Sequence, residues 1–155
     1  MNTSLWTDIA QHIGTATGEV FTGANHRSVG GGCINTAAVM EDQGRRYFVK
    51  LNDAPRLSMF EAEAEGLDEI GASNSVRVPQ PVCSGISGNQ AYLVLEHIAF
   101  APGDDPGAER LGRQLALMHR TQQKTFGRRR DNTIAPTPQI NTPASDWVAF
   151  WQQQR

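Results

Sequence analysis

The sequence predicts an α+β fold: an antiparallel sheet of about five strands with one packed helix, followed by further helical segments. Three observations support this prediction. Short runs of aromatic and β-branched residues alternate with turn signals up to residue 100. One amphipathic helical segment, 58–70, interrupts these runs. Beyond residue 107, apolar residues recur at helical spacing instead.

Composition and charge are those of an ordinary globular protein, and they argue against several classes of function. The 155 residues suit one domain that buries about 70% of its unfolded surface. A formal net charge of −2 points to neither a nucleic acid nor a membrane surface as partner. No apolar run could span a bilayer, and residues 1–10 lack the features of a signal peptide. Cys33 and Cys83 form neither a disulfide framework nor a metal pattern, so a cytoplasmic, reducing compartment is expected.

The elements expected before the amphipathic helix are one helix and three strands. Leu5, Ile9 and Ile13 recur at helical spacing and predict a helix over 3–15, with Thr3 as its N-cap. The strands that follow are separated by a glycine triplet and then by a turn with Gly44. They are expected at 19–29, 33–41 and 45–52.

The amphipathic helix has a recognisable start and an inward face. Ser58 and Glu61 form a capping box in its first turn, and Gly71 is expected to end it. Phe60 marks the apolar face, and Glu63 lies on the same face at i+3. Glu63 is therefore predicted to point inward, whereas Glu61 is occupied by the cap. The alternative for Glu63 is a boundary residue whose carboxylate reaches water.

The rest of the chain divides at a linker rich in proline and glycine. A hairpin is expected before the linker, with strands at 82–86 and 90–96, and the second strand is apolar enough to be buried on both faces. Three features are expected after it: a helix, an irregular loop and a capped last helix, at 108–123, at 125–145 and from Ser145 or Asp146 onward. The predicted organisation is a first lobe, a linker and the beginning of a helical second lobe, at 1–100, 101–107 and 108–155.

Lys50 is the residue that first points to a function. It lies in the central strand, within a run of residues otherwise suited to burial. Because side chains alternate across a strand, Phe48 and Lys50 share one face and Tyr47 and Val49 share the other. A lysine in a buried strand is costly unless an anion meets it. We therefore expect Lys50 to bind phosphate while the carboxylate of Glu63 holds it.

A glycine-rich stretch at 29–35 precedes this strand. Glycine lets backbone N–H groups approach phosphate oxygens because no Cβ intervenes. The residues expected to contact phosphate are Gly30, Gly31, Gly32, Cys33, Ile34 and Asn35. The alternative for this stretch is a flexible hairpin turn. Cys33 is either a reactive thiol beside backbone amides or a small buried residue.

A glycine-rich loop, a strand lysine and a helix glutamate, in this order, are the phosphate-handling parts of a kinase small lobe. Phe48, on the same face as Lys50, is then expected to lie against the adenine of ATP. The backbone groups of Glu96, His97 and Ile98, where the second hairpin strand ends, are expected to bond the adenine edge. The alternatives are a solvated strand end for Glu96 and an ordinary surface residue for His97.

Taken together, these residues resemble the N-terminal half of a fructosamine (ketosamine) kinase, a branch of the aminoglycoside- and choline-kinase-like superfamily. The resemblance covers essentially the whole chain and rests on an ordered set of motifs, each of which is modest alone. The matching stretches are Gly31-Gly32-Cys33-Ile34-Asn35, Phe48-Val49-Lys50-Leu51-Asn52, 59–67, 78–81, 95–97, 115–119, 126–127, 131–132, 137–139 with Asn141, and 146–147 with Phe150.

The resemblance implies a protein-kinase-like fold and ATP-dependent phosphorylation of a sugar hydroxyl on a ketosamine, commonly read as repair of glycated amines. It implies that Lys50 and Glu63 form the catalytic ion pair, and that ATP and Mg²⁺ are the cofactors. The loop cysteine is redox-sensitive in some relatives, which favours a role for Cys33. The family's catalytic loop and both Mg²⁺ ligands are expected downstream of Arg155, so the chain alone is expected to be inactive.

Two other functions remain open at this point. One is a small-molecule phosphotransferase of the aminoglycoside or choline type. The other is a non-catalytic nucleotide-binding or interaction module. The expected partners are ATP and a small-molecule ketosamine, with neither nucleic acid nor membrane. A homo-oligomer is also expected, formed through an exposed second-lobe surface or through Cys33.

Overall fold

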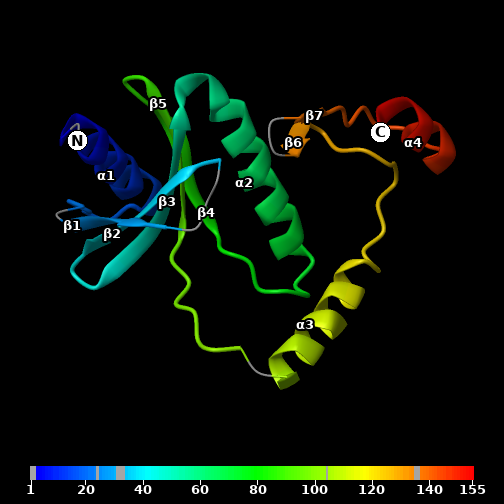
Figure 1. Cartoon of the computed structure of the whole chain (residues 1–155), viewed down its shortest axis with the longest axis horizontal. Coiled ribbons are helices and arrows are strands. Elements are labelled where there is room, and N and C mark those ends of the chain that lie inside the picture. Colours follow the sequence, from blue (N-terminus) through cyan, green and yellow to red (C-terminus); the bar gives the residue numbers. More distant parts are fainter. Residues whose placement is uncertain (1–2, 24, 31–33, 104, 135–136) are drawn as a thin grey trace. The chain divides into compact units, whose positions relative to one another are not determined.

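The computed structural model describes all residues except 1–2, 24, 31–33, 104 and 135–136 (Figure 1). The chain forms two compact units. The first contains Met1–Asp68 and Pro79–Phe100, and the second contains Glu69–Val78 and Ala101–Arg155. Each unit has its own packing and is described separately.

The first unit is built on one five-stranded antiparallel sheet, which confirms the predicted fold class. The strand order is β1-β2-β3-β5-β4, so the central strand β3 lies between β2 and β5. Tight turns connect the hairpins. Gln43 and Gly44, with φ of 50° and 81°, have the two positive φ values of the type I′ turns that join twisted strands. The strands are Asn25–Val29 (β1), Thr36–Asp42 (β2), Arg45–Asp53 (β3), Pro81–Ser87 (β4) and Gln90–Glu96 (β5).

A helix covers each face of this sheet (Figure 1). Helix α1, Thr3–Thr17, packs its apolar stripe against the face that carries Val49 and Tyr92. Helix α2, Leu57–Ala72, packs Phe60 against the opposite face. The two cores consist of Leu5, Ile9, Ala10, Ile13, Phe21, Met40, Val49, Leu51, Tyr92 and Val94 on the α1 side, and of Phe60, Ala91, Leu93 and Leu95 on the α2 side.

Strand β5 contributes to both cores, as its apolar run predicts. Every residue from Ala91 to Leu95 is buried. Tyr92 and Val94 point to the α1 side, and Leu93 and Leu95 point to the α2 side. A strand with α-helical layers on both faces needs apolar side chains at every position, so its sequence loses the alternation of a half-exposed strand.

The segment before β1 is irregular, so the predicted strand over 19–29 is wrong in its first half. Thr22 donates its backbone N–H and its hydroxyl to the carboxylate of Asp42 on β2, at 2.8 Å and 3.0 Å. Arg45 binds Glu19 at 2.7 Å. Gly23 has a φ of 60°, which breaks an extended run. Side-chain contacts with the β2–β3 hairpin therefore satisfy this segment in place of strand pairing.

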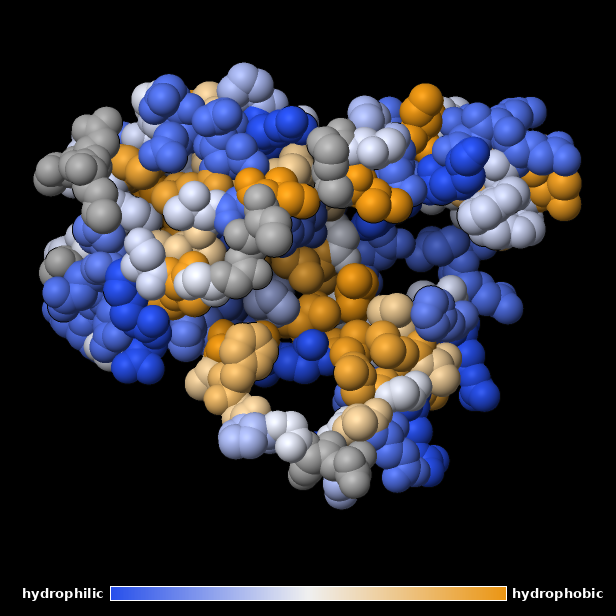
Figure 2. All heavy atoms as spheres, viewed as in Figure 1, coloured by the Kyte–Doolittle hydropathy of each residue, from blue (hydrophilic) through white to orange (hydrophobic). Residues whose placement is uncertain are grey.

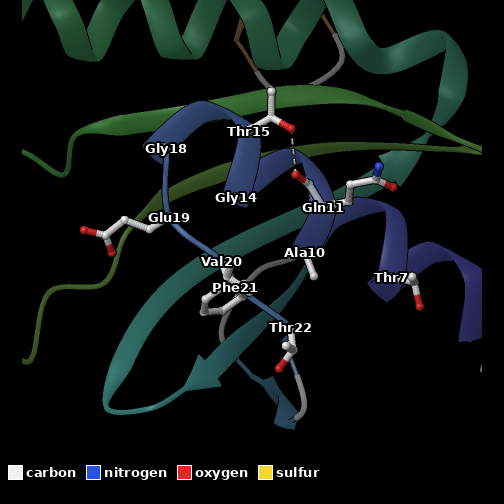
Figure 3. Close-up of a pocket in the computed structure, with 10 residues that line it drawn as sticks. All are labelled: Thr7, Ala10, Gln11, Gly14, Thr15, Gly18, Glu19, Val20, Phe21 and Thr22. Carbon is white, nitrogen blue, oxygen red and sulfur yellow. Dashed lines mark hydrogen bonds between the residues drawn. The ribbon is translucent and has the colours of Figure 1, made fainter.

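A shallow surface hollow lies between this segment and α1 (Figure 3). It is lined by the second half of α1, including Gly14, and by the segment from Gly18 to Thr22. Its lining is mainly apolar, and Ala10 of α1 and Val20 and Phe21 of the segment contribute to it. The hollow belongs to the α1 side of the sheet.

Helix α2 begins and ends differently from the prediction. A 3₁₀ turn at Ala54–Arg56 leads into it, and Pro55 occupies the first turn, where its fixed φ suits a helix start. Ser58 therefore lies inside the helix, and its assignment as the N-cap was wrong. Gly71 does not end the helix, because Asn74 takes the left-handed conformation with a φ of 51° and donates its N–H to the Gly71 carbonyl.

The second unit is mostly helix and loop. The first helix, α3, is Asp105–Met118, rather than the predicted 108–123, because Pro106 is accommodated in its first turn. The predicted irregular stretch contains a short hairpin, β6 (Asn132–Ile134) with β7 (Thr137–Gln139). The last helix, α4, is Trp147–Gln154, and Asp146 is its N-cap, accepting from the N–H of Ala149 at 2.7 Å.

A buried asparagine organises the loop between α3 and α4. Asn141 is 1% exposed. Its side-chain NH₂ donates to the Arg130 carbonyl and the Asn132 side chain, at 3.0 Å and 2.7 Å. Its Oδ1 accepts from Arg155 at 2.7 Å, and its backbone N–H donates to Asp131 at 2.7 Å. Polar groups thus take the place of an apolar core here, and they stay ordered because each is satisfied.

Apolar side chains remain exposed on this unit. Leu111, Leu115 and Leu117 on α3 are 47%, 39% and 54% exposed. Figure 2 shows apolar side chains gathered over α3. On α4, Trp147 is 49% exposed and Trp151 is 55% exposed. None of the described helices is long and apolar enough to cross a membrane.

We predict that Gly127→Ala destabilises the second unit. Gly127 has a φ of 96°, and a Cβ would lie 2.6 Å from the Asn141 carbonyl oxygen and 2.9 Å from that of Thr142. The expected loss is about 2–4 kcal/mol, measured by urea unfolding. The matched control is Gly112→Ala in α3, where a Cβ meets nothing within 4 Å. It should stabilise by about 0.5–1 kcal/mol, and equal effects of the two substitutions would contradict the steric argument.

We predict a pH-dependent stabilisation from Asp42. Its bond from the Thr22 backbone N–H lowers the pKa of the carboxyl below the ordinary value of 3.8. A lowered folded-state pKa contributes stability above the unfolded pKa, and this contribution is lost as pH falls through the folded value. Wild type should exceed Asp42→Asn in free energy of unfolding at about pH 6, and the difference should shrink below pH 3.8. If the difference in free energy of unfolding between wild type and Asp42→Asn does not change with pH, the Asp42 carboxylate does not contribute the predicted pH-dependent stability.

Candidate functional site

The candidate site lies on the α2 face of the sheet. Strand pairing places Lys50 beside Ala37 of β2 and Leu93 of β5. Leu93 belongs to the α2-side core, so Lys50 faces α2 as well, and Phe48 and Asn52 share its face by strand alternation. The sequence had predicted this division, with Tyr47, Val49 and Leu51 on the other face, and those three side chains lie in or against the α1-side core.

Lys50 and Glu63 form an ion pair, as the sequence predicted. Lys50 Nζ donates to Oε1 and Oε2 of Glu63 at 2.7 Å and 2.6 Å. The lysine and glutamate side chains are 22% and 32% exposed, so solvent still reaches the pair. An ammonium group has three N–H donors, and the two carboxylate oxygens engage two of them. Among the described residues no other group takes the third donor of Lys50, so an anion could bind it.

Helix phase selects Glu63. Phe60 is fully buried against β5, and Glu63 follows it at i+3 on the same side of α2. The earlier reason for setting Glu61 aside, its role in a capping box, does not hold because the helix begins before Ser58. The phase argument alone was sufficient.

The glycine-rich stretch is described at its two ends. Gly30 lies just after β1 with open space where a side chain would be. Ile34 is 53% exposed, and Asn35, directly before β2, is half-buried. The predictions for Gly31, Gly32 and Cys33 lie outside the described residues. The described ends therefore adjoin the neighbouring strands β1 and β2, and Asn35 is hydrogen-bonded to Asn52 of β3.

Asn52 is a site residue that the sequence reasoning did not single out. Its side-chain NH₂ donates to Asn35 Oδ1 at 2.7 Å and to the Ile34 carbonyl at 3.2 Å. It thus ties the end of the glycine-rich stretch to β3. Strand alternation could have identified it, because Asn52 follows Lys50 at i+2 and lies on the same face.

The predicted adenine-binding segment follows β5. The backbone N–H of Glu96 donates to the Gln80 carbonyl at 2.8 Å, and its carboxylate accepts from the Gln80 N–H at 3.3 Å. The Glu96 N–H is therefore engaged in the sheet. His97 and Ile98 are half-buried and make no backbone hydrogen bond to another described residue. Phe48 is half-buried and packs against the α2-side core, so part of its ring is covered by protein.

Cys83 lies on β4, away from Lys50. It packs against the α1-side core. Burial raises the pKa of its thiol to about 12, which keeps it protonated and unreactive at neutral pH. Nearby Tyr92 also has its pKa raised to about 12, mainly by burial, and its hydroxyl bonds His12 Nδ1 at 2.8 Å. These groups are structural parts of the α1 side.

No cluster of three or more His, Cys, Asp or Glu side chains that could hold a metal ion occurs among the described residues. The described groups that could bind an anion are the Lys50 ammonium and the polar groups at the end of the glycine-rich stretch. They lie on adjacent strands of one face, which is the arrangement expected for contacts with phosphate.

A family model decides the relationship of this chain. The model of the fructosamine kinase family matches residues 5–155. The chain belongs to the fructosamine kinase family. Among curated relatives, a candidate ketoamine kinase of Synechocystis is 42% identical to this chain over 151 residues. The match covers 97% of this chain and 51% of that protein. This chain is 43% identical over 131 residues to the chloroplastic protein-ribulosamine 3-kinase of Arabidopsis thaliana, covering 83% and 40%.

Solved structures agree with the family assignment. A candidate fructosamine-3-kinase from Thermobifida fusca is 36% identical, with a TM-score of 0.75 over 96% of this chain and 51% of that one. Another from Haemophilus somnus is 25% identical, with a TM-score of 0.87 over 95% and 50%. The chain spans about half the length of the curated relatives it matches.

We predict that Cys83 of this fructosamine kinase family member is unreactive in the folded state. In a Cys33→Ser variant, Cys83 is the remaining cysteine of the two in the sequence. With its thiol pKa raised to about 12, it should react with a thiol-specific chromogenic disulfide far more slowly at about pH 8 than the same variant unfolded in urea. Equal rates with and without urea would show that the thiol is accessible and ionised.

Proposed function

We propose that this chain is the ATP-binding part of a kinase that transfers the γ-phosphate of ATP to a sugar hydroxyl of a ketosamine. The observation that carries the proposal is the Lys50–Glu63 pair. Its ammonium keeps one donor for an anion while the carboxylate holds it in place. A strand lysine held by a helix glutamate is the arrangement that kinases use to position the α- and β-phosphates of ATP.

The glycine-rich stretch is proposed as the phosphate loop. Backbone N–H groups from Gly30 to Asn35 would meet the phosphates, and the roles of Gly31, Gly32 and Cys33 within it rest on the sequence pattern. Lys50 neutralises phosphate charge, and Glu63 orients Lys50. The support is positional, since this stretch leads directly into β2, which pairs with the strand that carries Lys50.

The segment after β5 is proposed to bind adenine. The backbone groups of His97 and Ile98, together with the carbonyl of Glu96, are the hydrogen-bonding groups for the base edge. Phe48 would contribute the exposed part of its ring to the adenine face. The Glu96 N–H, being engaged with Gln80, is left out of this proposal.

The acceptor comes from the names of the relatives. The Synechocystis relative is described as a ketoamine kinase, and the Arabidopsis relative as a protein-ribulosamine 3-kinase. Both names describe an amine-linked ketose as substrate, which supports a ketosamine acceptor and a role in repairing glycated amines. Mg²⁺ would accompany ATP and neutralise the developing charge, and we assign none of its ligands to this chain.

The remaining features of the proposal rest on sequence. We propose a nucleotide-binding lobe at 1–100, a linker at 101–107 and the start of an acceptor lobe at 108–155. We further propose a cytoplasmic location, on composition and cysteine content, and self-association through the exposed apolar face of α3 or through Cys33. Aminoglycoside or choline phosphorylation, and nucleotide binding without transfer, are the competing functions.

We predict that Lys50→Ala lowers the affinity of the chain for MgATP by about 10- to 100-fold, because charge-assisted bonds to phosphate are lost. The measurement is isothermal titration of the 155-residue chain. The matched control is Lys124→Ala, which removes an exposed lysine of the second unit and should leave the affinity unchanged. Circular dichroism checks that the fold persists. Unchanged affinity in folded Lys50→Ala would exclude Lys50 from the site.

The acceptor is tested in a chimaera that joins Arg155 to the second half of the Synechocystis relative, with that relative as a positive control. Transfer of labelled γ-phosphate to a glycated lysine, and not to an aminoglycoside or to choline, is the expected result. Transfer to one of the latter would favour the other phosphotransferase. ATP binding without transfer to any acceptor, alongside an active control, would favour the non-catalytic module.

A further inference from the structure

We propose that Asn52 is a positioning residue, which holds the side-chain amide of Asn35 with its NH₂ group presented to the phosphates of the nucleotide. This inference rests on the proposed ATP-binding function. It assigns a role to a side chain outside the predicted site and gives the Asn35 amide one defined orientation.

The orientation of Asn52 follows from a backbone group. The N–H of Asp53 can only donate, and it lies 2.8 Å from Asn52 Oδ1. Oδ1 is therefore the acceptor end of the side chain, and Nδ2 is at the other end. The second backbone group agrees, because the Ile34 carbonyl can only accept, and it lies 3.2 Å from Asn52 Nδ2. Two backbone groups thus fix which end of the Asn52 amide faces Asn35.

The orientation of Asn35 follows in turn. Asn52 Nδ2 donates to Asn35, so the Asn35 atom at 2.7 Å is its Oδ1. The NH₂ group of Asn35 then points away from Asn52. Within the described part of the chain, no acceptor bonds this NH₂ group. Asn35 is half-buried, so the NH₂ group has lost part of its hydration and gains from an anionic acceptor.

The position of this donor matches that of Lys50. Ala37 pairs with Lys50 and Thr36 pairs with Leu51, and Asn35 directly precedes the start of β2. Asn52 and Lys50 lie on one face of β3 by strand alternation, and the hydrogen bond from Asn52 brings the Asn35 side chain to that face. Residues i and i+2 of a strand, such as Lys50 and Asn52, are about 7 Å apart, and Asn35 is hydrogen-bonded to Asn52. One polyphosphate can therefore contact the Lys50 ammonium and the Asn35 NH₂ group together.

A purely structural role for Asn52 makes a different prediction. If Asn52 only anchored Ile34 and Asn35, its loss would loosen the loop whether or not Asn35 carried an amide. If Asn52 acts through the amide of Asn35, its removal matters only while that amide is present. A double-mutant cycle separates the two cases.

The experiment measures binding of MgATP and of adenosine to the 155-residue chain by isothermal titration. Asn35→Ala and Asn52→Ala should each weaken MgATP binding by about tenfold, the value of one hydrogen bond to a charged group. The double variant should be no weaker than Asn35→Ala alone. Adenosine binding should not change in any variant. The matched control is Asn89→Ala, an exposed asparagine of the β4–β5 turn, which should leave both affinities unchanged.

A second variant and a second readout protect the test against a folding defect. Asn52→Asp keeps the acceptor for the Asp53 N–H but replaces the NH₂ group, so the Asn35 amide should turn and present its oxygen to phosphate. Its effect on MgATP should largely disappear in the Asn35→Ala background. In ¹⁵N spectra, the Asn35 side-chain NH₂ signal should shift on adding MgATP to wild type and should not shift in Asn52→Asp.

The outcomes distinguish this inference from the function on which it rests. If wild type binds MgATP and the affinity losses of the two single variants multiply in the double variant, the positioning role is overturned and the nucleotide site is retained. An Asn35 NH₂ signal that does not shift when MgATP binds to wild type also overturns the positioning role and leaves the nucleotide site in place. Absence of both MgATP and adenosine binding in wild type overturns the proposed function, and the positioning role with it.

Discussion

The ion pair between Lys50 and Glu63 is the interaction on which the arrangement of the first unit depends. A charged ammonium on the inner face of a sheet is tolerated only when a carboxylate meets it. That carboxylate must come from a helix packed on the same face, at the correct phase. Helix α2 meets this requirement by burying Phe60 against β5, which brings Glu63 within 2.7 Å of Lys50 Nζ. The pair remains partly exposed, so its charge can be used by a ligand.

Two side chains, Asp42 and Asn52, tie irregular segments to the strands around this ion pair. On one side of the sheet, Asp42 ties the segment before β1 to β2 through Thr22. On the other, Asn52 ties the end of the glycine-rich stretch to β3. Both are short polar side chains that satisfy groups outside the regular pairing. They tie the segment before β1 and the end of the glycine-rich stretch to the sheet, which ladder pairing holds together.

Sequence reasoning was most accurate where one local rule applied. The Gln43-Gly44 turn, the doubly buried β5 and the inward phase of Glu63 follow from turn chemistry, apolar content and helical period, respectively. It was least accurate at element ends. The predicted strand over 19–29 is half irregular because Asp42 and Arg45, distant in sequence, bind that segment. Ser58 looked like an N-cap because the helical start at Pro55 was not recognised. The β6–β7 hairpin was missed, and it is tied through Asn132 to Asn141, whose other partners, Arg130 and Arg155, lie outside the hairpin.

By itself, the sequence determined the fold class, the two faces of β3 and the choice of Glu63 as the partner of Lys50. These depend on periodicity, which is encoded locally. The tertiary structure alone decided that Asn52 reaches Asn35 and Ile34 and that the Glu96 N–H bonds Gln80. It also decided that Cys83 is half-buried, with a raised thiol pKa. Each of these depends on which strands become neighbours and in what register, and a hydrogen bond or a desolvated thiol exists only once distant segments have been brought together.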